Sequence, residues 1–181
     1  MVGEDLGTVP PGVRPAIRRY GLHGMHVACF QMSPEPGQAL KPIKSNRLAS
    51  INTHDMVPFS AFWQGLEVRN RVELDLQTQM EGELVLAVRE NLKSALLDFL
   101  QNQALLDFRT SDLRDILHAL LIWLGRCKAP MMLVNLEPLE RDSAANILGT
   151  SQECPNWRNN EVQFRGIQQN GTSSGDAAAI G

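Results

Sequence analysis

Apolar residues recur along the chain with two different spacings, and each spacing predicts one kind of element. Short, continuously apolar runs bounded by glycine or polar residues are typical of buried strands, and they occupy 24–30, 48–52 and 131–134. Apolar residues three or four positions apart predict helices over about 11–20, 59–63, 67–76 and 83–101, with another ending at Gly125. The segment 33–46, with three prolines and a glycine, predicts a long loop. Short apolar strands separated by helices favour a parallel sheet in an α/β protein.

Two of the helices carry apolar stripes that should face a core. In the helix over 83–101 the stripe is Leu84, Val88, Leu92, Leu96 and Phe99. In the helix that ends at Gly125, Thr110 or Ser111 is the expected N-cap, because a side-chain oxygen there accepts a hydrogen bond from the first turn. The stripe of this second helix is Leu113, Ile116, Leu117, Leu120 and Leu124.

The end of the chain differs in composition from the rest. From Gln168 onward, glutamine, asparagine, glycine, serine and alanine predominate. Such a segment buries too little apolar surface to offset the entropy of ordering. We therefore expect residues 1–166 to belong to one folded unit and 167–181 to form a disordered, low-complexity tail.

Composition and charge exclude several classes of protein. The net charge of −3 gives no basic excess for a phosphate backbone, so we expect no nucleic-acid partner. The longest apolar run, 116–124, is too short to span a membrane, and no basic, apolar leader is visible at the start, so we expect no membrane association. Three widely spaced cysteines predict no disulfide framework, and we expect a cytoplasmic protein. His23 and His26 lack an evident third ligand, so no metal is expected.

Polar residues follow the predicted strands. Glu4 and Asp5 come after a strand stub, Met1-Val2; His54 and Asp55 follow the second strand; Asn135 and Glu137 follow the third. The loops after parallel strands share one edge of the sheet, where ligands and catalytic residues gather. Carboxylates on one rim are what glycoside chemistry requires.

Four sequence blocks, in order, resemble the 4-α-glucanotransferases (amylomaltase, or disproportionating enzyme). They are Gly3-Glu4-Asp5-Leu6-Gly7-Thr8-Val9-Pro10; Ser50-Ile51-Asn52-Thr53-His54-Asp55-Met56 with Pro58-Phe59 and Phe62-Trp63; Leu133-Val134-Asn135-Leu136-Glu137; and Asn146, Gly149-Thr150 and Glu153-x-Pro155-Asn156-Trp157-Arg158. A lone Thr-His-Asp would be weak evidence. The ordered set, which covers most of residues 2–158, is strong.

The resemblance implies a (β/α)₈ barrel that passes part of an α-1,4-glucan (maltodextrin) donor to the 4-hydroxyl of a glucose or maltooligosaccharide acceptor. It implies a retaining mechanism through a covalent glycosyl–enzyme intermediate, with no metal or organic cofactor. Glu4 matches the acid/base and Asp55 the third carboxylate, which stabilises the oxocarbenium-like transition state. His54, Asp5 and Asn146 match substrate-contacting positions, and Trp157 is a further substrate-binding candidate because its ring could stack on a pyranose.

The nucleophilic aspartate and its arginine belong, in that family, to a strand before the Glu-Asp-Leu-Gly block. The 181 residues therefore match the end of the fifth strand through the eighth, an incomplete barrel. We expect little or no transferase activity from the isolated chain, and an N-terminal half encoded separately is one source of the rest. The alternative is a non-catalytic half-barrel that binds glucan weakly or associates with another chain. A helix-rich interaction module ranks last, because it makes the strand-end carboxylates coincidental.

Individual residues also have purely structural interpretations. Asp55 could cap the helix that begins near Pro58. For Trp63 and Trp157, packing in the core or a loop is the interpretation we favour, narrowly for Trp157. Cys29 should be buried and inert, since nothing near it in the sequence would lower its pKa.

Overall fold

The computed structural model describes residues 1–109 and 112–135. The predicted tail, Asn146 and Trp157 lie outside this part. A parallel sheet, ordered β1-β2-β3, is formed by β1 (Gly24–Val27), β2 (Arg47–Ser50) and β3 (Met131–Leu133). Upstream of β1, Val2 pairs with His23 in a parallel bridge, and the N–H of Gly3 donates to the carbonyl of His23. The predicted α/β class and the parallel pairing are confirmed.

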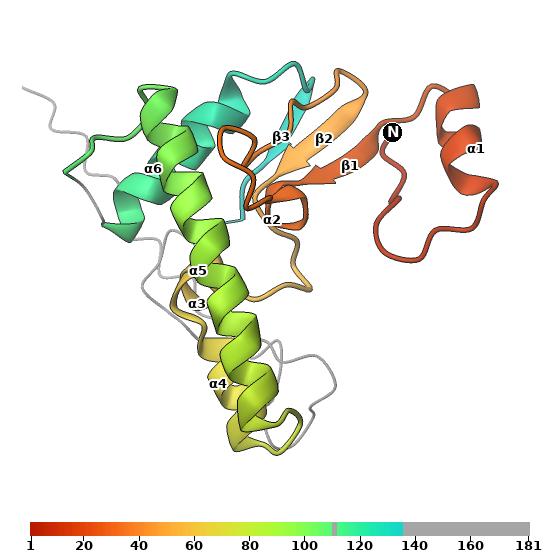
Figure 1. Cartoon of the computed structure of the whole chain (residues 1–181). Helices are drawn as coiled ribbons and strands as arrows, with labels where there is room; N and C mark the ends of the chain where they lie inside the picture. Colours follow the sequence, from red (N-terminus) through yellow and green to blue (C-terminus); the bar gives the residue numbers. More distant parts are fainter. Residues whose placement is uncertain (110–111, 136–181) are drawn as a thin grey trace, which may run out of the picture.

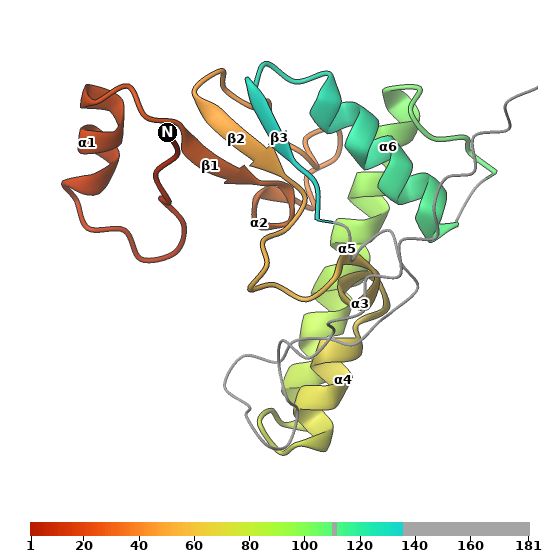
Figure 2. The same cartoon turned by 180° about the vertical axis from the view of Figure 1, so that it is seen from behind.

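Helices surround this sheet unevenly (Figure 1). α1 (Val13–Arg19) lies on one side, and α2 (Ala28–Gln31) follows β1 directly. α3 (Phe59–Gln64), α4 (Leu66–Glu73) and the long α5 (Gln79–Asn102) form an arm that extends away from the strands. α6 (Leu113–Gly125) lies beside β3 in both views (Figure 2). The buried core lies between the sheet and α3, α5 and α6, where Ala49, Phe59, Leu96, Ile116 and Leu120 are almost fully enclosed.

The strand predicted over 24–30 is wrong in its second half. β1 ends at Val27, opposite Ser50, the last residue of β2. The chain then turns into α2, and the N–H of Cys29 donates to the carbonyl of Ile51 instead of continuing the ladder. A short apolar run cannot by itself distinguish a buried strand from a buried helical turn, so the sequence pattern did not show this break.

The stripe predicted on α5 is only partly a core face. Leu96 and Phe99 are buried, but Leu84 is 67% and Val88 51% exposed. The first half of α5 packs against α4 through another face, centred on Gly82. A Cβ at Gly82 would lie 2.8 Å from the Val72 side chain. Because α4 and α5 approach so closely at Gly82, the lack of a side chain at this position, rather than the apolar stripe, decides which face of α5 packs against α4.

The predicted start of α6 also needs correction. The N-cap is Asp112, whose Oδ1 accepts a hydrogen bond from the N–H of Arg114 at 2.9 Å. The cap therefore comes after Thr110 and Ser111, the two residues proposed for it. The predicted apolar stripe is confirmed, since Ile116, Leu117, Leu120 and Leu124 are buried.

Candidate active-site edge

Glu4 precedes Asp5, whose side chain is held by contacts to two strands. Asp5 is buried, and its Oδ1 accepts from the N–H of Met25 at 2.9 Å, while its Oδ2 pairs with Nη1 of Arg47 at 2.5 Å. Met25 lies in β1 and Arg47 begins β2, so this carboxylate ties the N-terminal segment to both strands. The side chain of Glu4 itself is exposed.

Charge and hydrogen bonding keep Asp5 ionised. Burial alone would raise its pKa, but the hydrogen bonds from Arg47 and the Met25 N–H and the positive charges of Arg47 and Arg14 outweigh it. The pKa of Asp5 therefore lies below its ordinary value. A Cβ at Gly24 would overlap the Arg47 guanidinium and lie 2.9 Å from Asp5 Oδ1, so only glycine leaves room for this pair.

His54 and Asp55 follow β2 in an exposed turn. Nε2 of His54 lies 3.5 Å from Oδ1 of Asp55, with side-chain exposures of 76% and 54%. The capping alternative for Asp55 is not observed, because the N-cap residue of α3 is Pro58 and no side chain caps this helix. Both side chains are thus open to solvent at the end of β2.

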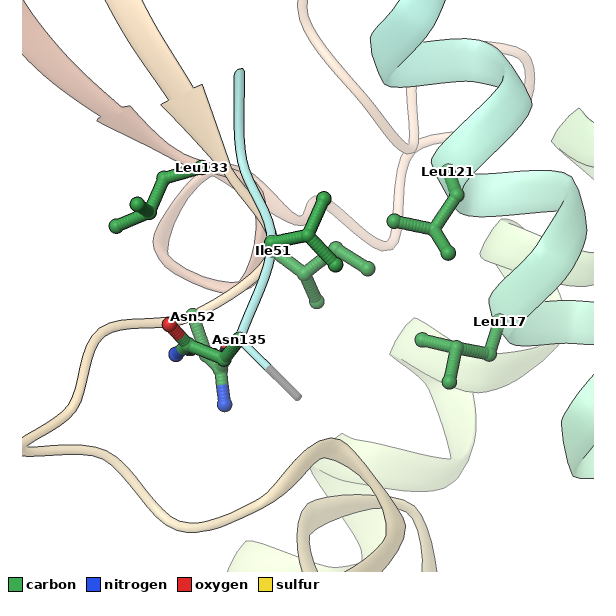
Figure 3. A pocket seen from close by; sticks show the side chains of 7 residues that line it. Ile51, Asn52, Leu117, Leu121, Leu133 and Asn135 are labelled. Atoms are coloured by element: carbon green, nitrogen blue, oxygen red, sulfur yellow. Dashed lines mark hydrogen bonds between the residues drawn. The ribbon is translucent and has the colours of Figure 1, made fainter. Parts of the chain in front are cut away.

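Asn52 and Asn135 join the ends of β2 and β3, a contact that the sequence analysis missed. Nδ2 of Asn135 donates to Oδ1 of Asn52 at 2.9 Å, and Nδ2 of Asn52 donates to the carbonyl of Val57. In Figure 3 the two amides lie together beside a small pocket that Ile51 and Leu117 also line. The position of each asparagine just after an apolar strand was the available signal. The hydrogen bond to Val57 O holds the turn that carries His54 and Asp55.

The aromatic residues of α3 pack against one another and against the core. The ring centroids of Phe59 and Trp63 are 5.7 Å apart, and Lys93 Nζ lies over the Trp63 ring. The Arg89 guanidinium lies 4.4 Å from the centroid of Phe62, donates to the Phe62 carbonyl and pairs with Glu67. The packing interpretation of Trp63 is confirmed.

Cys29, a half-buried residue, lies in α2 rather than in the predicted strand. Burial raises the pKa of its thiol to about 12, against the opposing charge of Arg89. Within residues 1–109 and 112–135, no group of three or more histidine, cysteine or acidic side chains is placed to hold a metal ion. Nor does any helix of those residues have the length and apolarity to cross a membrane.

The described site residues thus form three groups: an exposed glutamate beside the start of β1, a His–Asp pair after the end of β2, and an amide pair that joins the ends of β2 and β3. The first two groups carry the carboxylates of Glu4 and Asp55, which can exchange protons or stabilise positive charge. Asn146 and Trp157, the remaining predicted site residues, lie outside the described residues, as does Glu137.

Comparison with known proteins gives the family. The family model for 4-alpha-glucanotransferase matches residues 1–161, and the chain therefore belongs to this family. The 4-alpha-glucanotransferase of Mycobacterium tuberculosis (strain H37Rv) is 34% identical over 165 residues, which is 87% of this chain and 23% of that protein. The Haemophilus influenzae 4-alpha-glucanotransferase is 27% identical over 170 residues, covering 87% of this chain and 24% of the relative.

Solved structures agree in fold. The amylomaltase of Corynebacterium glutamicum superposes with a TM-score of 0.68 at 22% identity, over 86% of this chain and 24% of that one. An amylomaltase from Streptococcus agalactiae, in complex with acarbose, gives a TM-score of 0.54 at 13% identity, over 87% and 27%. The chain spans about a quarter of the length of each of these proteins.

Proposed function

We propose that these residues form the C-terminal part of the catalytic barrel of a 4-α-glucanotransferase, from the end of the fifth strand through the eighth. The observation that carries the proposal is the placement of Glu4 and Asp55 on segments held by neighbouring parallel strands, in a chain of this family. The substrates would be an α-1,4-glucan donor and a glucose or maltooligosaccharide acceptor.

In the proposed reaction Glu4 acts as acid and then as base. It protonates the glycosidic oxygen as a carboxylate nucleophile, supplied from outside these 181 residues, attacks the anomeric carbon. In the second step Glu4 removes the proton of the acceptor 4-hydroxyl, which attacks the glycosyl–enzyme intermediate and restores the α-linkage. Asp55 and His54 hold the sugar hydroxyls at the cleaved bond, and Asp55 stabilises positive charge in the transition state.

The anchoring of Asp5 supports this role for Glu4. A general acid must be held within hydrogen-bond reach of the atom it protonates. Asp5, fixed through Met25 and Arg47, restrains the backbone of the residue before it. We therefore assign Asp5 to positioning Glu4, since its side chain is only 3% exposed and both of its oxygens are engaged.

The exposed surface of the edge strand β3 supports the proposal that this sheet is only part of a barrel. Met131, Met132 and Leu133, which make up β3, expose 37%, 44% and 48% of their surface. An exposed apolar edge strand offers unpaired backbone groups to a further strand. We propose that a further barrel strand pairs here, and that the strand with the nucleophile pairs at the opposite edge, beside the segment around Val2.

The test is a chimera in which the matched segment of the Mycobacterium tuberculosis 4-alpha-glucanotransferase is replaced by residues 1–161. Incubated with maltotriose, the chimera should release glucose and form longer maltodextrins, and the isolated 181-residue chain should not. Glu4→Gln and Asp55→Asn should each lower the chimera's rate by about 10³-fold or more. Glu35→Gln, at an exposed loop position, is the matched control and should leave the rate unchanged. Full activity of the Glu4→Gln chimera would refute the assignment.

A further inference from the structure

An open groove lies at the other end of the strands from the candidate active-site edge. It is formed where the loop before β2, the end of α5 and the turn from α6 into β3 come together. In Figures 1 and 2 the starts of β2 and β3 lie side by side at this end. Its volume is about 1130 Å³, which is large enough to hold a small organic ligand.

The groove is cationic although the chain as a whole is acidic. Four basic residues line it, Lys41, Lys44, Arg126 and Lys128, and all four are exposed. Of the described residues that line the groove, none is acidic. A concentration of one charge sign along a concave surface raises the local concentration of an oppositely charged ligand. Because the whole chain has a net charge of −3, the four basic residues form a local concentration of positive charge.

The groove also offers an aromatic ring and amide side chains. Trp123 lines it and packs edge-on against Phe99, with ring centroids 6.1 Å apart. Gln38 and Gln103 line it as well. The indole can lie against a flat ring or a pyranose face, while amides donate and accept hydrogen bonds with hydroxyl or base groups. Inorganic anions would use the cations alone, so the ring and the amides point to an organic ligand.

We propose that this groove is a binding site for a phosphorylated ring compound, in which the phosphate meets the cations and the ring lies against Trp123. A sugar phosphate and a nucleotide share this chemistry. The site is separate from the candidate active-site edge and does not rest on the proposed transferase activity. Guanidinium and ammonium groups bind phosphate through charge-assisted hydrogen bonds, so occupancy should fall as ionic strength rises.

Isothermal titration of the full chain tests the proposal with four probes: the 6-phosphate ester of maltotriose, ADP, maltotriose and inorganic phosphate. At least one of the two organic phosphates should bind about tenfold or more tightly than both maltotriose and inorganic phosphate. Whichever ester binds better identifies the source of the ligand as sugar or nucleotide. Binding of neither ester, or equal binding of inorganic phosphate or maltotriose, overturns the proposal.

Two double variants locate the site. Lys41→Gln with Lys44→Gln should weaken binding of the preferred ester about tenfold, the combined effect of two exposed ion pairs. Arg18→Gln with Arg71→Gln removes the same charge from exposed positions on α1 and α4 and should leave the affinity unchanged. Equal effects of the two pairs would mean that net charge, not this groove, governs binding, and would overturn the proposal. Matching thermal melts of the variants exclude unfolding as the cause.

Cys127 provides a direct probe, because it lines the groove. In a Cys154→Ser background, the preferred ester should slow alkylation of Cys127 by iodoacetamide, measured by peptide mass spectrometry. An unchanged alkylation rate at saturating ester would place the ligand elsewhere and contradict the proposal.

Discussion

The carboxylate of Asp5 and the guanidinium of Arg47 form an ion pair across 42 residues of sequence, with side-chain exposures of 3% and 27%. The pair joins the segment that carries Glu4 to the first residue of β2. The other carboxylate oxygen of Asp5, Oδ1, accepts a hydrogen bond from the N–H of Met25 in β1. Glu4 therefore owes its position to strands that come later in the chain.

Replacing Arg47 should test this anchoring. Arg47→Met removes the closer of the two guanidinium groups beside the buried Asp5 carboxylate and leaves Arg14, whose Nε lies 3.9 Å from Oδ2; loss of one member of a buried pair costs about 3 kcal/mol. Urea unfolding followed by circular dichroism should show this loss of the free energy of unfolding. Arg18→Met, at an exposed position on α1, should change it by less than about 0.5 kcal/mol. An equal, small effect of both variants would mean that the pair does not hold the segment.

Acid should weaken the fold through Asp5. Because its pKa is lower in the folded chain than the ordinary 3.8, the unfolded state binds its proton first as pH falls. The stabilisation is present above about pH 4 and is lost as pH drops through the folded-state pKa. Urea unfolding at pH 7, 4 and 3 should show this fall, and Asp5→Asn should flatten it below pH 4.

A second, milder fall in stability should begin nearer neutrality, at His26. Burial first, and then the charge of Arg47, lowers the pKa of His26 below its ordinary 6.5. The unfolded state therefore takes up this proton before the folded state does, so stability decreases as pH falls below about 6.5. His26→Gln should remove this part of the pH dependence; an unchanged slope between pH 7 and 5 would contradict it.

The start of α5 depends on a capping box. The Thr78 hydroxyl accepts from the N–H of Glu81, and the Glu81 carboxylate accepts from the Thr78 N–H and hydroxyl. These bonds lower the pKa of Glu81. Thr78→Ala should reduce the free energy of unfolding by about 1 kcal/mol, whereas Thr78→Ser, which keeps the hydroxyl, should stay close to the parent.

Cys29 should react slowly with alkylating reagents in the folded chain. With a pKa of about 12, Cys29 is about one part in ten thousand thiolate at pH 8, and only the thiolate reacts readily. Iodoacetamide should leave Cys29 unlabelled in the folded chain and label it in urea. Rapid labelling of Cys29 under native conditions would show that α2 opens.

The sequence pattern predicted the order of the elements and the parallel sheet, because strand composition and helical spacing are local properties. It failed where long-range packing decides the outcome. The break after Val27 depends on Ile51, which accepts from Cys29. The inward face of α5 depends on how closely Gly82 approaches Val72. The candidate carboxylates and both asparagines were visible as residues at strand ends. The hydrogen bond between Asn52 and Asn135, which are 83 positions apart, was not visible, because it depends on how the strands pair.

The most direct test of the central claim, that Glu4 is the acid/base of the transfer, compares two donors in the chimera. With maltotriose, the leaving sugar needs a proton, so Glu4→Gln should lower the rate of donor cleavage by about 10³-fold or more. With α-maltosyl fluoride, fluoride departs without protonation, and the same variant should form the glycosyl–enzyme with a far smaller loss, measured by the fluoride released in the first turnover. Asp55→Asn should slow both donors. An equal loss with both donors in Glu4→Gln, or no loss with either, would contradict the account.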